Sequence, residues 1–114
     1  PWTAEAVENI AKNCMEHTPP GGTVTVAVRE DALATTIAVS DTGPGIAPED
    51  LPHIFERFYR GGAVEEANVA QPAGFGIGLS LAQALVSAQG GTLRASNNPV
   101  GGARFEIAFP KLVV

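Results

Sequence analysis

A Pro-Pro-Gly-Gly run at residues 19–22 is the feature that most constrains the fold, because it separates two hydrophobic periods. Before it, apolar residues over 3–17 recur with the period of an amphipathic helix, and Thr3 is in position for an N-cap. After it, valines alternate over 23–29, and a β-branched apolar run covers 35–40. Proline and glycine end a helix and turn the chain. The sequence therefore predicts a helix followed by a β-hairpin.

The rest of the chain continues this mixture of helices and paired strands. A short helix is predicted over residues 48–57, whereas 61–73 show no hydrophobic period. Residues 79–89 are apolar almost all round, which predicts a buried helix. Strands over 92–96 and 103–109 complete the pattern. Together these segments predict an α+β fold: a two-layer sandwich with about three helices on one face of a mixed, mostly antiparallel sheet.

Composition limits the classes of function. The chain has 114 residues, of which 45% are hydrophobic and 17% charged, and this suits one globular domain. A net charge of −5 disfavours nucleic acid as the main partner, because phosphate backbones are bound by basic surfaces. Cys14 is the single cysteine, which excludes an internal disulfide and a thiol-based zinc site. The uncharged stretch 67–93 is rich in glycine and amides, so it makes a poor membrane span.

Three short motifs carry candidate chemistry. A Gly-Phe-Gly-Ile-Gly run at residues 74–78 precedes a helix, where bare N–H groups and the helix dipole favour a phosphate. Asp41 follows an apolar strand in Asp-Thr-Gly-Pro-Gly, where its carboxylate can accept a hydrogen bond from an exocyclic amine. Asn9 and Asn13 lie one helical turn apart and offer amide oxygens to Mg²⁺. Taken singly, each motif also has an ordinary explanation: a hinge, a capped turn, or a solvated polar face.

In their order along the chain, these motifs and the aromatic cluster at residues 55–59 resemble one family. It is the catalytic ATP-binding (HATPase) domain of bacterial two-component sensor histidine kinases, in the GHKL superfamily shared with gyrase-type and mismatch-repair ATPases. The resemblance covers nearly the whole chain and implies the Bergerat-type ATP-binding fold. It implies a domain that binds ATP and Mg²⁺ and donates the γ-phosphate to a histidine on a separate dimerisation and phosphoacceptor domain. We therefore expect residues 1–114 to form one catalytic domain within a longer kinase.

The resemblance also implies a role for each matching residue. Asn13 is expected to bind Mg²⁺ and act in catalysis, and Asn9 to lie beside the phosphates. Asp41 is expected to read the adenine amine. The whole implied nucleotide-binding set is Asn9, Asn13, His17, Asp41, Gly43, Gly45, Ile46, Phe55, Phe58, Tyr59, Arg60, Gly74, Gly76, Ile77, Gly78 and Leu79.

Two later segments have implied roles as well. Phe55 and Phe58 resemble the family's F box and are expected to pack a lid, residues 61–73, that closes over the phosphates. The Gly-Gly pair at 101–102 resembles a third glycine motif near the adenine. Ala103 follows it where the family often has threonine, so a hydroxyl contact with the base would be missing.

The end of the first helix departs from the family's pattern. Glu16 and His17 stand where many members carry a basic residue and then an aromatic one. A glutamate repels phosphate, so Arg60 is expected to supply the catalytic positive charge, with Arg57 as the second choice. His17 either borders the nucleotide or caps the helix, and the sequence leaves both open.

Two other functions remain open: a GHKL-type ATPase, and an anti-sigma-type serine kinase or nucleotide switch. Asn9 stands where the resemblance places a glutamate base in the ATPases, and an amide cannot take a proton, which favours the kinase. The aromatic cluster favours the sensor-kinase branch. Neither His17 nor His53 lies in a sequence that resembles a phosphoacceptor helix.

The resemblance also implies partners and a location. The direct partner is the dimerisation and phosphoacceptor domain of the same kinase, and a response regulator is served indirectly. No nucleic acid and no direct membrane contact is expected for this domain. It would lie in the cytoplasm, as part of a membrane-anchored sensor kinase.

Overall fold

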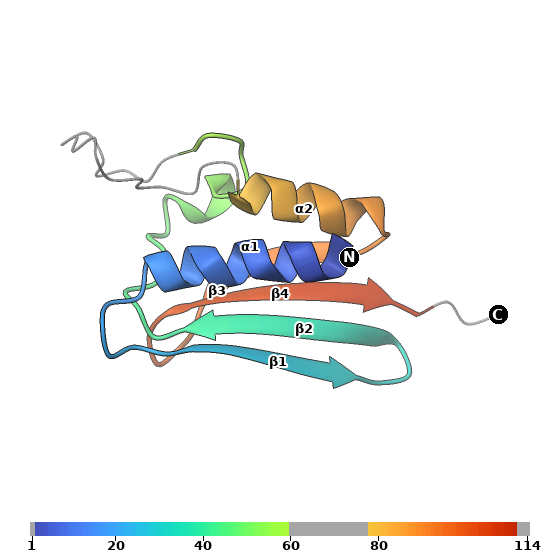
Figure 1. Cartoon of the computed structure of the whole chain (residues 1–114), viewed down its shortest axis with the longest axis horizontal. Helices are drawn as coiled ribbons and strands as arrows, with labels where there is room; N and C mark the ends of the chain where they lie inside the picture. The colour runs from blue at the N-terminus through green and yellow to red at the C-terminus, as the bar shows by residue number, and fades with distance from the viewer. Residues whose placement is uncertain (1, 60–77, 112–114) are drawn as a thin grey trace.

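The computed structural model describes residues 2–59 and 78–111, and its elements follow the predicted order. They are α1 (Trp2–Glu16), β1 (Val24–Glu30), β2 (Ala34–Asp41), the 3-10 helix η1 (Leu51–His53), α2 (Gly78–Ala88), β3 (Thr92–Asn97) and β4 (Ala103–Pro110). Within these residues the strands form a four-stranded antiparallel sheet in the order β1-β2-β4-β3. Both α-helices lie on one face of this sheet (Figure 1). The predicted α+β two-layer architecture is confirmed.

The register of the two central strands builds the core. Ile37 of β2 pairs with Ile107 of β4, and Val39 pairs with Phe105, which aligns the apolar side chains of both strands. Burying a side chain of this kind stabilises the fold by roughly 1.5–3 kcal/mol. The helices cover these strands with their own buried residues, which are Ala6, Ile10 and Cys14 from α1 and Leu79, Ala82 and Val86 from α2.

Two predicted helices differ from the structure. The helix predicted over 48–57 is wrong in extent, because only the three residues of η1 are helical there. Pro52 has no N–H group and is tolerated only in the first turn, where it lies. The prediction that α2 is buried all round is also wrong, since Leu81 is 40% exposed. Only one side of α2 packs against the core, and its other side exposes Leu81 together with the small residues Ala84, Ser87 and Ala88.

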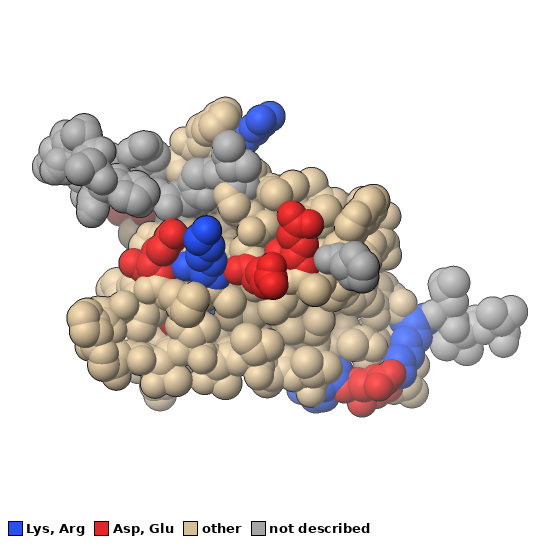
Figure 2. All heavy atoms as spheres, in the orientation of Figure 1, with Lys and Arg blue, Asp and Glu red and all other residues tan. Residues whose placement is uncertain are grey.

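Charged side chains gather along the exposed side of α1 (Figure 2). Glu5, Glu8 and Glu16 are exposed there, and Lys12 is the only basic residue of this helix. An acidic helix surface of this kind repels a nucleic-acid backbone. Neither α-helix of the described residues has the length and hydropathy needed to cross a bilayer.

The end of β2 and the start of β4 meet in a close backbone contact. Gly102 has a φ of +91°, and a Cβ at this position would collide with the carbonyl group of Asp41. Gly101 has a φ of +111°, but a Cβ there would meet open space. A side chain at residue 101 would therefore cause backbone strain alone, whereas a side chain at residue 102 would cause backbone strain and a steric clash.

We expect Gly102→Ala to lower the free energy of unfolding by about 3 kcal/mol or more, because it combines left-handed strain with a backbone collision. Gly101→Ala is the matched control and should cost only about 1–2 kcal/mol, the strain of a left-handed residue with a side chain. Urea denaturation of both variants measures the difference. Equal losses would contradict the steric origin of the effect.

Candidate functional site

A solvent-open pocket lies where α1, the loop after β2 and the start of β4 meet. Its lining is Asn13, His17, Asp41, Pro44, Gly45, Ile46, Ala103 and Phe105. The structure thus brings together five members of the predicted nucleotide-binding set, which come from separate parts of the sequence. A mostly apolar surface with a few convergent polar groups is typical of a small-molecule site.

Asp41 is the acidic group of this pocket, and the fold holds it rigidly. It is the last residue of β2 and is 5% exposed. Its Oδ1 accepts hydrogen bonds from the N–H of Gly43, at 3.0 Å, and from the N–H of Ala103, at 2.9 Å. These backbone donors leave Oδ2 to other partners. The result is a fixed acceptor that can bind a donor such as an exocyclic amine.

The Cys14 thiol lies next to the Asp41 carboxylate, within the core. Cys14 is 1% exposed, and its burial, followed by the charge of Asp41 and a hydrogen bond to Asp41, together raise the pKa of the thiol to about 12. The thiol therefore stays protonated around neutral pH and acts as a donor toward Asp41. The sequence analysis used this cysteine only to exclude disulfides and zinc, and no local pattern connects it with Asp41.

Among the described residues, each of the two asparagines of α1 has an amide atom without a hydrogen-bond partner. Asn13 is 9% exposed and lines the pocket, and within the described chain its amide makes no hydrogen bond. Asn9 lies one turn earlier, and its Nδ2 is buried with no partner among the described residues. An unpaired buried N–H group suits an anionic oxygen, and the Oδ1 atom of Asn13 suits a hard cation.

The amide oxygen of Asn13 suits a Mg²⁺ ion that is held mainly by the phosphates of a bound substrate. Among the described residues no three His, Cys, Asp or Glu side chains cluster as a metal site. Mg²⁺ keeps several waters and is commonly held by one or two protein oxygens together with substrate phosphates. A single amide oxygen from Asn13 is consistent with that mode.

His17 caps the end of α1 and also lines the pocket. Its Nδ1 lies 2.9 Å from the carbonyl oxygen of Asn13, and its backbone N–H donates to the same oxygen at 3.2 Å. Because a carbonyl only accepts, Nδ1 carries the hydrogen in this contact. His17 also lines the pocket, so the residue that caps α1 borders the site as well.

The aromatic cluster lies beside the pocket, with Phe55 as the link. Phe55 packs edge-on against Phe105, with ring centroids 6.4 Å apart, and Phe105 lines the pocket. Phe58 is 62% exposed, has a φ of +66° and lies under the guanidinium group of Arg57 at 5.1 Å. The structure thus places Phe55 behind the pocket surface and Phe58 toward solvent.

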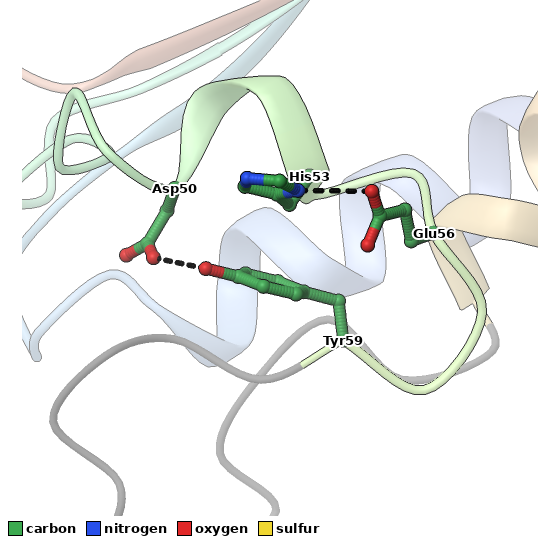
Figure 3. A network of polar contacts seen from close by, with 4 residues as sticks. All are labelled: Asp50, His53, Glu56 and Tyr59. Carbon is green, nitrogen blue, oxygen red and sulfur yellow. Dashed lines mark hydrogen bonds and ion pairs between the residues drawn. The ribbon is translucent and has the colours of Figure 1, made fainter.

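A polar network holds the end of this cluster (Figure 3). The Tyr59 hydroxyl donates to Oδ1 of Asp50 at 2.6 Å, and this bond raises the pKa of Tyr59 to about 12. The His53 ring stacks on Tyr59, and its Nδ1 lies 2.9 Å from Oε2 of Glu56. Asp50 is buried, so the network ties the residues after η1 to the body of the fold.

Other predicted site residues fall outside the described part of the chain or lie in the helix α2. Arg60, Gly74, Gly76, Ile77 and the predicted lid, 61–73, lie outside the described residues. Gly78 begins α2, and Leu79 is fully buried in the core. The structure adds pocket residues that the sequence did not select as ligands, namely Pro44, Ala103 and Phe105.

A family model described as "Histidine kinase-, DNA gyrase B-, and HSP90-like ATPase" matches residues 2–113, so the chain belongs to this family. It is 35% identical to the sensor-like histidine kinase SenX3 of Mycobacterium tuberculosis over 108 residues, which are 95% of this chain and 26% of SenX3. The solved mycobacterial sensor histidine kinase MprB superposes with a TM-score of 0.77 at 32% identity, covering 93% of this chain and 70% of that one. Full-length ShkA, in complex with AMPPNP, superposes with a TM-score of 0.74 at 27% identity, covering 99% of this chain and 22% of ShkA.

These likenesses confirm the predicted class, an ATP-binding domain of the sensor histidine kinase type. The chain spans about a quarter of the length of SenX3. The match covers the elements that build the pocket, α1, β2 and β4, in their order along the chain.

We expect the Cys14 thiol to react with iodoacetamide about a thousandfold more slowly than an unperturbed thiol at pH 8, because only the thiolate attacks and its pKa rises from 9.0 to about 12. The same shift contributes stability below pH 9 that is lost as the pH rises toward 12. Mass spectrometry of the labelled chain, with and without urea, measures the rate. Rapid labelling of the folded chain would contradict this burial.

Proposed function

We propose that this chain is the catalytic domain of a sensor histidine kinase that binds ATP with Mg²⁺ and donates the γ-phosphate to a histidine of a separate helical domain. The observation that carries the proposal is the buried carboxylate of Asp41, held by the N–H groups of Gly43 and Ala103 in a pocket that Asn13 also lines. The ShkA structure supports it, because AMPPNP is an ATP analogue.

Adenine recognition follows from the chemistry of the pocket. The Asp41 carboxylate accepts a hydrogen bond from the exocyclic amine of adenine, and Ile46 and Phe105 provide an apolar surface for the ring. Guanine carries a carbonyl oxygen where adenine carries this amine. An acceptor would then face an acceptor, so the same carboxylate rejects GTP.

The phosphates extend along the asparagine side of α1. The unpaired Nδ2 of Asn9 donates to a phosphate oxygen, and the Oδ1 of Asn13 is the protein oxygen that would hold Mg²⁺. When bound, the ion neutralises the charge that develops between the β- and γ-phosphates. Such charge compensation is needed because the chain carries a net charge of −5 and places Glu16 at the end of the same helix. Arg60 and the glycines of 74–78 complete this end of the site in our proposal.

The transfer step needs an acceptor from outside the chain. The imidazole nitrogen of the acceptor histidine attacks the γ-phosphorus in line, the bond to the oxygen of ADP breaks, and the imidazole N–H proton is released. His17 is held against the Asn13 carbonyl, and His53 is stacked on Tyr59. These contacts hold both rings in place, which favours an acceptor outside the chain, and in our proposal this acceptor is the phosphoacceptor domain of the same kinase.

Hydrolysis of ATP by this chain should be slow. Asn9 stands where the resemblance places the glutamate base of the related ATPases, and a neutral amide cannot remove a proton. A positioned general base contributes typically about 10²–10⁴-fold to a reaction of this kind. In our proposal the domain works on the cytoplasmic side of a membrane-anchored kinase and serves a response regulator through the acceptor histidine.

We expect Asp41→Asn to weaken ATP binding by about 1.5–3 kcal/mol and to abolish the preference for ATP over GTP. The asparagine keeps an oxygen for the N–H groups of Gly43 and Ala103 but sets an amide N–H against the adenine amine. Asp50→Asn is the matched control, a second buried carboxylate whose hydrogen-bond partner is Tyr59. Titration calorimetry with ATP and GTP measures both variants, and unchanged ATP affinity in Asp41→Asn would remove Asp41 from the site.

We expect no phosphohistidine on the chain alone, and transfer to an added dimeric phosphoacceptor domain of the same kinase. Radiolabelled ATP tests this, because phosphohistidine is stable in alkali and labile in acid. Substitution of the acceptor histidine by alanine in the added domain is the control. Label on His17 or His53 of the isolated chain, or rapid hydrolysis without an acceptor, would overturn the proposal that the acceptor histidine lies on a separate domain.

A further inference from the structure

Asn97, the last residue of β3, makes an unusual pair of bonds to a loop that lies far away in sequence. Its Oδ1 accepts a hydrogen bond from the N–H of Ile46 at 2.7 Å, and its Nδ2 donates to the carbonyl of the same residue at 2.8 Å. One side-chain amide therefore satisfies both backbone groups of Ile46, as a neighbouring strand would do. The two residues are 51 positions apart.

We propose that Asn97 is a positioning residue for nucleotide recognition: it clamps the loop of Gly45 and Ile46 so that this loop forms one wall of the pocket. The inference rests on the proposed function, because it assigns Asn97 to the same nucleotide site. Asn97 does not itself line the pocket, whereas Pro44, Gly45 and Ile46 do. It acts through the backbone that it holds.

The clamp and the Asp41 carboxylate share one support. Asn97 is paired with Ala103 across β3 and β4, and the N–H of Ala103 is a donor to Asp41. The turn between these strands is closed by its own bonds, from the N–H of Asn98 to the carbonyl of Gly102 and from the N–H of Gly101 to the carbonyl of Asn98. The Asn97–Ala103 pair of β3 and β4 therefore fixes both Asp41, the proposed acceptor for adenine, and the loop that forms the neighbouring wall of the pocket.

The fit between Asn97 and the loop is close. Gly45 has a φ of +83°, and a Cβ on it would lie 2.7 Å from Oδ1 of Asn97. A side chain at residue 45 would push the amide away from Ile46, so glycine and asparagine match each other across the contact. Ile46 is 7% exposed, and its buried side chain belongs to both the core and the pocket. Release of the clamp would therefore let the wall move while most of the core stays packed.

The decisive variants are Asn97→Ala and Asn97→Asp, with Asn98→Ala as the matched control. Alanine removes both bonds. Aspartate keeps the size and the acceptor for the Ile46 N–H but sets a carboxylate oxygen against the Ile46 carbonyl, so it tests the donor. Among the described residues, the side-chain amide of Asn98 donates only to the carbonyl of Ala103, at 3.3 Å, at the end of its own turn. The control therefore loses an asparagine amide at the same hairpin without releasing the loop.

We expect ATP affinity to fall on the order of tenfold in Asn97→Ala and in Asn97→Asp, with a similar loss of ATP-over-GTP preference, whereas Asn98→Ala keeps both. The preference is the informative quantity, because a merely structural role would lower stability without changing which base is selected. Titration calorimetry well below each variant's melting temperature measures it. Normal affinity and preference in both Asn97 variants would overturn the proposal.

Amide hydrogen exchange at Ile46, followed by NMR without nucleotide, separates this inference from the proposed function. We expect exchange at Ile46 to accelerate on the order of tenfold or more in Asn97→Ala, while exchange at the core residue Ile107 stays unchanged. Unchanged exchange at Ile46 would overturn the clamp, whatever the chain binds. If the unsubstituted chain fails to bind ATP, the proposed function falls, and this exchange measurement still decides whether the clamp exists.

Discussion

The contact between Asp41 and the start of β4 is the interaction on which the pocket depends. Gly102 lets the two backbones approach, and the N–H of Ala103 then reaches the Asp41 carboxylate at 2.9 Å. A side chain at residue 102 would force the strands apart at the point where the acceptor is oriented. Glycine adopts this left-handed conformation readily, and the two backbone N–H groups offset the cost of burying the carboxylate. The contact between Asp41 and residues 102–103 therefore sets both the approach of β2 to β4 and the orientation of the Asp41 carboxylate in the pocket.

The helix α1 contributes residues to both the core and the pocket, and these residues lie on the same side of the helix. Ala6, Ile10 and Cys14 pack against the sheet, while Asn13, adjacent to Cys14, lines the pocket at the edge of the buried surface. Because core packing fixes the rotation of the helix, it also fixes where the amides lie. The opposite side is acidic (Figure 2). In our proposal this acidic chain therefore binds a polyanion through oriented N–H groups and a metal ion instead of a basic surface.

The sequence predicted the parts of the fold that depend on local pattern. The helix before the Pro-Pro-Gly-Gly run, the strand pairs and the pocket residues Asn13 and Asp41 follow from hydrophobic period and short motifs. It could not predict contacts between distant segments, such as the clamp of Asn97 on Ile46 or the thiol of Cys14 beside Asp41. The excess of predicted helix near Pro52, and the prediction of a fully buried α2, came from reading composition without knowing which side the sheet would cover.

The pocket has two walls that differ in how they are supported. The Asn13 wall belongs to a 15-residue helix packed on the sheet, so its backbone is held by regular hydrogen bonds. The Gly45 and Ile46 wall belongs to a loop, and a loop must satisfy its backbone groups through side chains or water. Here Asn97 supplies both bonds for Ile46. A rigid helix on one side and a loop held by a single amide on the other imply that the pocket changes width mainly by movement of the loop. In our proposal base selection depends on the distance between Asp41 and that loop, and Asn97, which holds the loop, lies outside every motif predicted to bind the nucleotide.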